Sequence, residues 1–187
     1  MIRAVVCCLL LAQAPILKLP SETAEPAYGS PANLDFEKGA AGQLPDGWSL
    51  EPDSRFRGYS AELRREGCRT GSGCAVLMSG PETRKGSAGA ILQEFAAAPY
   101  LGKRMRLRAW VKLEEGRRTD AIKLMLATDG EKSEETFVQK GRGVSAPEWT
   151  LAEVEGKVPF RAEVVHIVVT VTSGKAWVDD VSFEEVK

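Results

Sequence analysis

Residues able to perform catalysis are sparse in this chain of 187 residues. His166 is its one histidine and stands within the apolar run Val165–Val169, a setting typical of a structural or surface histidine rather than a catalytic base. No Gly-x-Ser-x-Gly turn supplies an activated serine, and the sequence contains neither a phosphate-binding loop nor a dinucleotide fingerprint. We therefore predict that the protein is not an enzyme, although a serine or carboxylate beside His166 would favour a hydrolase.

Carboxylates are numerous, but their spacing does not indicate a site. Glutamate pairs at 114–115, 134–135 and 184–185 are typical of solvated loops or strand ends. Glycoside hydrolysis by two carboxylates depends on the distance between them, which a sequence does not show. Hydrolysis is therefore a third hypothesis, behind two binding functions.

Trp110 suggests a different chemistry, because flat aromatic rings stack on the apolar faces of sugars. It alternates with apolar residues and shares one strand face with Arg106 and Arg108, while Lys123 is expected on a neighbouring strand. A tryptophan with such cationic neighbours suits an acidic sugar. Alternatively, Trp110 packs under a loop with arginines lying over it through cation–π contact.

The other aromatic residues divide into two groups. Phe56 and Tyr59 stand in the segment Arg-Phe-Arg-Gly-Tyr, which we interpret as a loop, and they are the next ligand candidates. Three tryptophans are interpreted as core or edge anchors: Trp48, Trp149 and Trp177. Phe, Trp and Tyr together number only 13, and the expected loops favour Arg, Glu and Lys, so composition alone does not indicate a dedicated sugar cleft.

The elements that must position these residues are short strands. Alternation is clearest at 104–112, where Met105, Leu107, Ala109 and Val111 share a face, and it recurs in other segments. Those segments are 75–79, 89–95, 121–128, 134–139, 149–158, 163–172 and 176–186. Gly and Pro separate most of them, and helix is expected to be scarce. We predict an all-β, two-sheet antiparallel jelly-roll sandwich of eight or nine strands.

The amino terminus is typical of an exported protein. A single arginine precedes an apolar stretch too short for a membrane-spanning helix, so residues 1–14 are interpreted as a signal peptide whose end is uncertain. Residues 15–32 are expected to be a flexible spacer, and 33–187 the folded domain. We expect a secreted or periplasmic protein with no stable membrane span after processing. Nucleic acid is an unfavourable partner, because 25 Lys and Arg are balanced by 26 Asp and Glu.

Export affects the interpretation of the two later cysteines, because disulfides persist outside the cytosol. Cys68 and Cys74 enclose the turn-rich segment Arg-Thr-Gly-Ser-Gly, which can fold the chain back on itself. We predict a disulfide between them. A zinc site would need further His or Cys ligands, and only His166 is available.

Both ends of the predicted domain carry motifs of a known family. The segment 33–39 reads Asn-Leu-Asp-Phe-Glu-Lys-Gly, and 176–183 reads Ala-Trp-Val-Asp-Asp-Val-Ser-Phe. Between them, residues 71–77 are similar to a turn and strand of that family. Residues 100–112 are similar to its Ala-Trp-Val-Lys strand, and the motifs occur in the same order along the chain. The chain thus resembles galactose-binding-like jelly rolls, especially carbohydrate-binding modules, over about residues 33 to 187.

The resemblance implies a structural calcium ion, because many such domains hold one between the opening Phe-Glu and the closing Asp strand. Glu37 and Asp179 are the expected side-chain ligands, with Asp180 as the alternate and carbonyls near Gly71 and Ser72 contributing. Alternation places Asp179 on the same face as Phe183, towards the interior, where a carboxylate needs a cation or hydrogen-bond donors. The alternative is that these carboxylates cap turns or pair with arginines.

Together these expectations favour a non-catalytic module that recognises a glycan, such as a cell-envelope or extracellular polysaccharide. Trp110, Arg106 and Arg108 would form its site, with help from the loop aromatics. The second hypothesis is a protein-interaction or structural domain without a sugar site.

Overall fold

The computed structural model describes residues 29–116, 121–130 and 137–187. The predicted signal peptide and residues 15–28 of the predicted spacer lie outside this part of the chain. Residues 29–32, the end of that spacer, lie along the domain: Ala32 and the Gln93 side chain exchange two hydrogen bonds of 2.8 Å. Within the described residues, no helix is long and apolar enough to cross a membrane.

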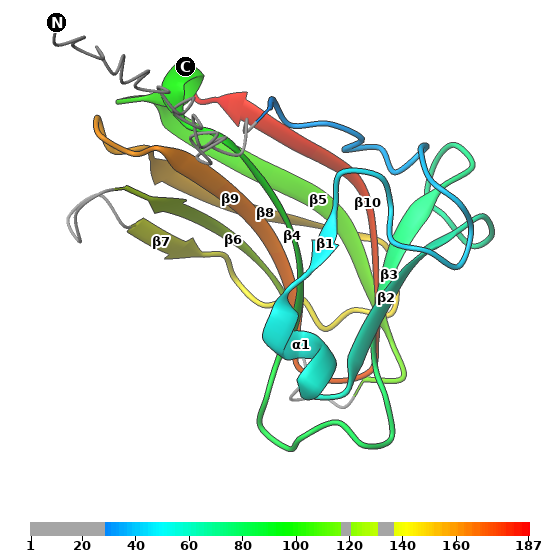
Figure 1. Cartoon of the computed structure of the whole chain (residues 1–187). Helices are drawn as coiled ribbons and strands as arrows, with labels where there is room; N and C mark the ends of the chain where they lie inside the picture. The colour runs from blue at the N-terminus through cyan, green and yellow to red at the C-terminus, as the bar shows by residue number, and fades with distance from the viewer. Residues whose placement is uncertain (1–28, 117–120, 131–136) are drawn as a thin grey trace, which may run out of the picture.

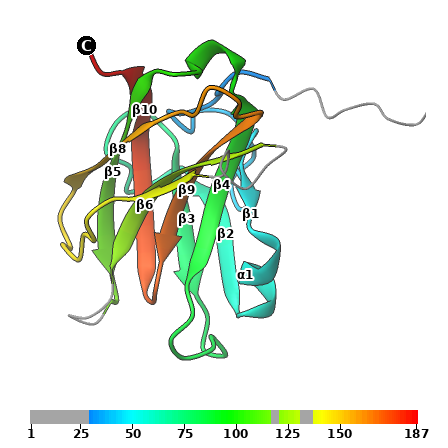
Figure 2. The same cartoon turned by 90° about the vertical axis from the view of Figure 1, so that its left-hand side faces the viewer.

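Ten strands in these residues form two five-stranded sheets, in which every pair of neighbours is antiparallel (Figure 1). Sheet A contains, in spatial order, β1 (Ser49–Leu50), β4 (Gly89–Ala96), β9 (Val164–Val171), β6 (Ile122–Asp129) and β7 (Phe137–Lys140). Sheet B contains β2 (Tyr59–Arg64), β3 (Cys74–Ser79), β10 (Lys175–Glu185), β5 (Arg104–Glu114) and β8 (Thr150–Lys157). In Figure 2 the two sheets overlap as stacked layers, which confirms the predicted antiparallel sandwich.

Helix is scarce in the described residues, as expected. A single helical turn, α1 (Pro52–Phe56), follows β1, and a 3₁₀ turn, η1 (Ala98–Tyr100), follows β4. Seven of the predicted strands match observed ones within two residues at each end, and the eighth overlaps β7, although residues 134–136 lie outside the described part. Alternating burial therefore predicted most of the two sheets.

Strand β2 was not predicted, and the placement of Tyr59 in a loop is wrong. Tyr59 begins this strand and is only 3% exposed, because its ring packs in the core. Its hydroxyl lies 2.7 Å from the Thr172 carbonyl and 3.0 Å from the Ser87 carbonyl. The strand does alternate, with Tyr59, Ala61 and Leu63 separated by polar residues, but the segment Arg-Phe-Arg-Gly-Tyr before it was interpreted as a loop that includes Tyr59.

The core lies between the sheets and contains the alternate side chains of the central strands. The inward residues of β5 and β9 are those expected from alternation: Met105, Leu107, Ala109, Val111, Val165, Ile167, Val169 and Val171. An aromatic cluster closes one end, where the Phe95 ring lies 5.6 Å from that of Tyr100 and 5.3 Å from that of Phe183, both edge-on. Such contacts add to the free energy gained by burial.

A β-bulge interrupts strand β10 and corrects the predicted alternation at the carboxyl end. The pairing with β5 shifts between Asp179 and Ser182, and Asp180 adopts a left-handed backbone conformation with φ of 47°. Because the bulge adds an unpaired residue, Asp179 and Phe183 point to opposite faces of sheet B. Asp179 is buried, as predicted, but on the outer face and not in the interior.

Truncation of Phe95 tests the importance of the aromatic cluster. Phe95→Ala should lower the free energy of unfolding by about 3–5 kcal/mol, because it removes a fully buried ring and leaves a cavity. Val138→Ala, at a half-exposed position of β7, should change it by less than about 0.5 kcal/mol. Chemical denaturation measures both, and equal effects would contradict this description of the core.

Candidate functional site

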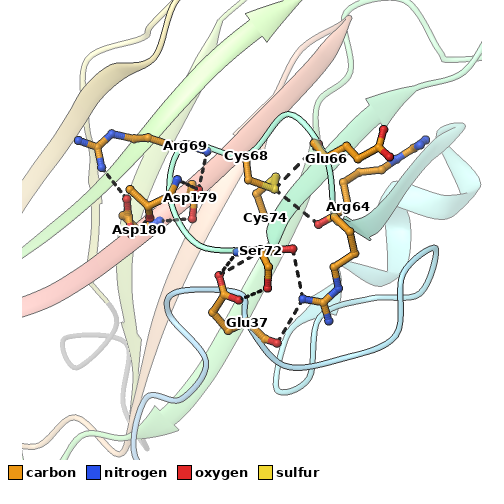
Figure 3. Close-up of a disulfide and its surroundings, with 12 residues drawn as sticks. Glu37, Arg64, Glu66, Cys68, Arg69, Ser72, Cys74, Asp179 and Asp180 are labelled. Carbon is orange, nitrogen blue, oxygen red and sulfur yellow. Dashed lines mark hydrogen bonds and ion pairs between the residues drawn. A yellow bond between two sulfur atoms is a disulfide. The ribbon is translucent and has the colours of Figure 1, made fainter.

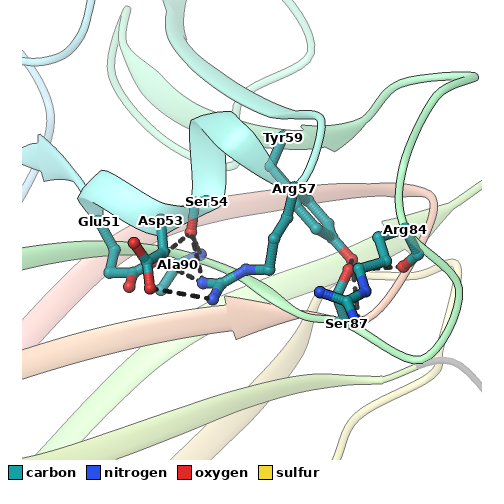
Figure 4. A network of polar contacts seen from close by, with 8 residues as sticks. All are labelled: Glu51, Asp53, Ser54, Arg57, Tyr59, Arg84, Ser87 and Ala90. Carbon is teal, nitrogen blue, oxygen red and sulfur yellow. Dashed lines mark hydrogen bonds and ion pairs between the residues drawn. The ribbon is translucent and has the colours of Figure 1, made fainter.

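Helix α1 is fixed to sheet A by a buried serine (Figure 4). The Ser54 hydroxyl is fully buried, donates to the Glu51 carboxylate at 2.6 Å and accepts the Ala90 N–H of β4 at 2.9 Å. Arg57 donates to the same carboxylate at 2.5 Å, and the Glu51 N–H donates to the Ala90 carbonyl at 2.9 Å. These contacts hold the turn rigidly beside the strand, and so they position the residues at both of its ends.

A groove of about 460 Å³ crosses the outer face of sheet A next to this helix. Leu92 and Val168 are direct cross-strand partners and form its floor together with Ala127, while Pro52 and Leu50 line the side next to α1. Its polar lining is Ser49, Glu51, Glu94, Asp129 and His166. A mainly apolar concavity of this size with a few polar groups is the usual form of a small-ligand site.

His166 lies in the groove between two carboxylates, Glu94 and Asp129. Its Nδ1 is 3.1 Å from Glu94, which is its direct partner on β4, and its Nε2 is 2.9 Å from Asp129 of β6. The Nε2 contact lacks hydrogen-bond geometry, so this buried atom has no hydrogen-bond partner among the described residues. A carboxylate beside His166 is the feature expected to favour a hydrolase, and two carboxylates lie there.

Phe56 is an exposed aromatic residue of α1 that is not among the residues lining the groove. It is 90% exposed and stands four residues after the groove residue Pro52, at the end of the same helical turn. Residues four apart lie on roughly the same helix face, so Phe56 and Pro52 share one side of α1. The predicted ligand candidate Phe56 therefore belongs to the helix beside a groove that the sequence did not reveal.

The predicted Trp110 surface lies on the opposite side of the sandwich. Trp110 stands on the outer face of sheet B, but the Arg69 guanidinium covers its ring at 3.8 Å from the centroid. Lys123, expected nearby, belongs to β6 of sheet A. The structure thus matches the alternative in which a loop arginine lies over this tryptophan.

The arginines beside Trp110 are engaged by glutamates. Arg106 and Arg108 face Glu155 and Glu153 across the β5–β8 pair, at 2.5 and 2.6 Å. Arg108 also contacts Glu184 at 3.1 Å. Both arginines expected to bind an acidic sugar are therefore already paired with carboxylates, which a charged ligand would have to displace.

The predicted disulfide is present and closes a loop over the outer face of sheet B (Figure 3). Cys68 and Cys74 have Cα atoms 5.4 Å apart. Asp179 lies beneath this loop, where it accepts the backbone N–H groups of Arg69 at 2.9 Å and Thr70 at 3.1 Å. Burial raises the pKa of the Asp179 carboxyl, and these backbone hydrogen bonds partly oppose the shift.

Glu37 and Asp180 hold the same loop from two sides. Glu37 accepts the Ser72 hydroxyl at 2.6 Å and the N–H groups of Ser72 and Gly73 at 2.9 and 3.1 Å. The hydroxyl and then the N–H of Ser72 are the main causes of a lowered Glu37 pKa. Asp180 contacts the Arg69 guanidinium at 2.6 Å and accepts the Thr70 hydroxyl at 2.8 Å. The three expected calcium ligands therefore cap turns and pair with an arginine.

The carbonyls near the expected calcium site are also engaged, by Arg65. Its guanidinium donates to the carbonyls of Gly39, Glu37 and Ser72 at 2.7, 3.3 and 3.4 Å. Among the described residues, no group of three or more His, Cys, Asp or Glu side chains converges as metal ligands. These residues therefore do not form an open oxygen cage, and the expectation of calcium rests on the resemblance alone.

Two other hollows are less suited to a ligand. One of about 320 Å³ lies beside Gly42 and Leu63, and another of about 430 Å³ lies between Val144 and Leu151. Backbone and paired charges line much of the first, where Arg64 contacts Glu62. Of these three hollows among the described residues, the groove on sheet A is the one that combines an apolar floor with carboxylates that lie opposite an imidazole.

Comparison with known proteins supports the fold. Neither a protein-family model nor a curated protein matches the sequence. Among solved structures, the second family 22 xylan-binding module of Xyn10C from Paenibacillus barcinonensis has a TM-score of 0.60 at 16% identity, covering 82% of this chain and 98% of that one. A family 61 module solved with β-1,4-galactotriose has a TM-score of 0.52 at 13% identity, covering 83% and 97%. The chain thus shares the jelly-roll fold of these modules.

A third similar structure is part of a longer enzyme. The CBM22-1-GH10 modules of xylanase 10B from Clostridium thermocellum, solved with xylohexaose, match with a TM-score of 0.60 at 20% identity. The match covers 76% of this chain but only 26% of the xylanase chain. At these identities the likeness establishes the two-sheet jelly-roll architecture and not the ligand.

Acid titration tests the contribution of Glu37. The pKa of the Glu37 carboxyl is lowered in the folded state from an ordinary 4.5. As the pH falls, this carboxylate is therefore protonated in the unfolded chain before it is protonated in the folded one. Its stabilising effect is thus complete above about pH 4.5 and is lost as the pH falls through the folded-state pKa. The difference in unfolding free energy between wild type and Glu37→Gln should therefore be largest at neutral pH and shrink towards pH 3. A constant difference would contradict this, and Glu66→Gln serves as a control.

Melting experiments test whether Arg65 or calcium holds the loop. Arg65→Met should lower the free energy of unfolding by about 1 kcal/mol, because three carbonyls lose a charged donor at a partly solvated site. Arg64→Met, at an exposed position paired with Glu62, is the matched control.

Wild type should melt at the same temperature in excess calcium and in EDTA. Calcium at 100 times its Kd would add about 2.7 kcal/mol to the free energy of unfolding. A melting temperature several degrees higher in calcium would therefore disprove the assignment of the loop contacts to Arg65.

Proposed function

We propose that the chain is a secreted, non-catalytic module that binds a glycan in the groove on the outer face of sheet A. The observation that supports this is the groove itself, with its apolar floor and two partly exposed carboxylates. An exposed aromatic ring, Phe56, stands on the adjoining helix α1. A sugar has the matching chemistry, since its C–H faces pack on Leu92 and Val168 while its hydroxyls donate to carboxylates. Ionised carboxylates accept such hydrogen bonds strongly.

Phe56 has the geometry of a stacking residue in this proposal. Its ring is free of contacts that would cover it, as its 90% exposure shows, and the helix that bears it is fixed by buried Ser54. Because the backbone that bears the ring is already fixed, only side-chain conformational entropy is lost when a ligand stacks on it. The jelly-roll modules with a similar fold supply supporting context, because two of the matched structures were solved with oligosaccharides.

Binding of the full chain to a glycan array provides the test, with Phe56→Ala and Trp110→Ala as variants on opposite faces. Phe56→Ala should weaken binding about tenfold or more, since loss of an aromatic stacking contact typically costs about 1–2 kcal/mol. Trp110→Ala should leave binding unchanged. Loss of binding in Trp110→Ala alone would move the site to sheet B. Absence of binding across the array, with normal melting, would favour a protein-interaction domain.

A second candidate function follows from the two carboxylates beside His166. An imidazole between Glu94 and Asp129 could transfer protons during hydrolysis. Both carboxylates point at the ring in this arrangement, whereas a glycosidase directs them at opposite sides of the scissile bond. New reducing ends after incubation with a bound glycan, and their absence with His166→Gln, would favour this function over simple binding.

A further inference from the structure

We infer that the groove selects glycans without acidic groups, and that Glu94 and Asp129 are the residues that exclude acidic ones. This inference rests on the proposed function, because it specifies the ligand class of the same groove. The lining residues include three carboxylates and neither lysine nor arginine. The groove thus differs in charge from the Trp110 surface, for which the sequence suggested an acidic sugar.

The charge balance of the groove is negative at every protonation state of the histidine. Glu51 is neutralised by Arg57 at 2.5 Å. Glu94 and Asp129 each contact only His166 among the charged groups of the described residues, so a protonated imidazole balances one of the two charges at most. Their side chains are 44% and 62% exposed, and both carboxylates therefore meet any ligand that enters the groove.

Glu94 and Asp129 also explain which ligand groups are accepted. An ionised carboxylate has acceptor sites only, so it binds the hydroxyl or amide donors of an uncharged sugar. A uronate or sulfate brings a like charge into contact distance, where repulsion lowers affinity by about tenfold or more at a partly solvated site. Strand pairing fixes this arrangement. Glu94 of β4 is the direct cross-strand partner of His166 on one side, and Ala127 of β6 is its partner on the other. Asp129 follows Ala127 by two residues, so it stands on the same face of the sheet.

The test compares uncharged and acidic probes with the full chain at low ionic strength. The uncharged probes are cellohexaose, xylohexaose, mannohexaose and galactan, and the acidic probes are polygalacturonate, alginate and hyaluronan. Binding to one or more uncharged probes, with each acidic probe at least tenfold weaker, is the expected result. Phe56-dependent binding of an acidic probe with comparable affinity would overturn the inference but leave the proposed function intact. If no probe of either class binds, the proposed function fails and the inference fails with it.

A charge-removing double variant tests the assignment to these two residues. Glu94→Gln with Asp129→Asn should strengthen binding of the acidic probes about tenfold or more and lessen their dependence on salt. Glu184→Gln with Glu185→Gln changes the net charge equally on sheet B, where both side chains are about half exposed, and should have no such effect. Equal changes in both double variants, or no change in either, would show that Glu94 and Asp129 do not set the selectivity. Unchanged melting of each variant confirms that the comparison concerns intact protein.

Discussion

Burial of alternate side chains fixes the register of every central strand, and the face of each functional residue follows from it. In β9, Val165 and Ile167 fill the core, so His166 between them must stand outside. A slip of one residue would exchange these positions and bury an imidazole in an apolar layer. The antiparallel pairing then places Glu94 of β4 directly opposite His166. The groove on sheet A is thus a consequence of core packing as much as of its own residues.

The sandwich departs from this regularity where β10 bulges, and there carboxylates replace strand pairing as the organising contacts. The bulge buries Asp179 under the loop that the disulfide closes, and the carboxylate accepts two loop N–H groups that would otherwise lack partners. Glu37 does the same from the other side of the loop. The motifs at the two ends of the domain therefore stabilise a turn, which explains why they indicate the fold and carry little information about a ligand.

Sequence patterns predicted the parts of the molecule that depend on local periodicity. Strands such as β5 and β9 were correctly placed because an apolar residue recurs at every second position. Strand β2 was missed although it alternates, because its first residue, Tyr59, was taken for a loop residue next to Gly58. The disulfide was predictable from two cysteines around a turn-rich segment. Pairing of strands, in contrast, depends on contacts between distant segments, and the sequence does not encode it in any local pattern.

The candidate site was hidden for this reason. Its lining comes from β1, α1, β4, β6 and β9, which are separated by many residues, and no single segment shows the combination. Trp110 was correctly placed on an outer face, but its covering by Arg69 depends on a loop folded back from between β2 and β3. Alternation predicts the face on which a side chain stands and not what covers that face.

The two outer faces of the sandwich therefore differ in what their charges can do. On sheet B, Arg106 and Arg108 meet Glu155 and Glu153 along adjacent strands, and a ligand would have to displace these pairs before it gained any contact. On sheet A, Glu94 and Asp129 share one histidine, so acceptor capacity remains for a ligand's donors. Exposed ion pairs add little stability, yet they neutralise a surface. The face with fewer ionic contacts is for that reason the one better suited to recognise a polar molecule.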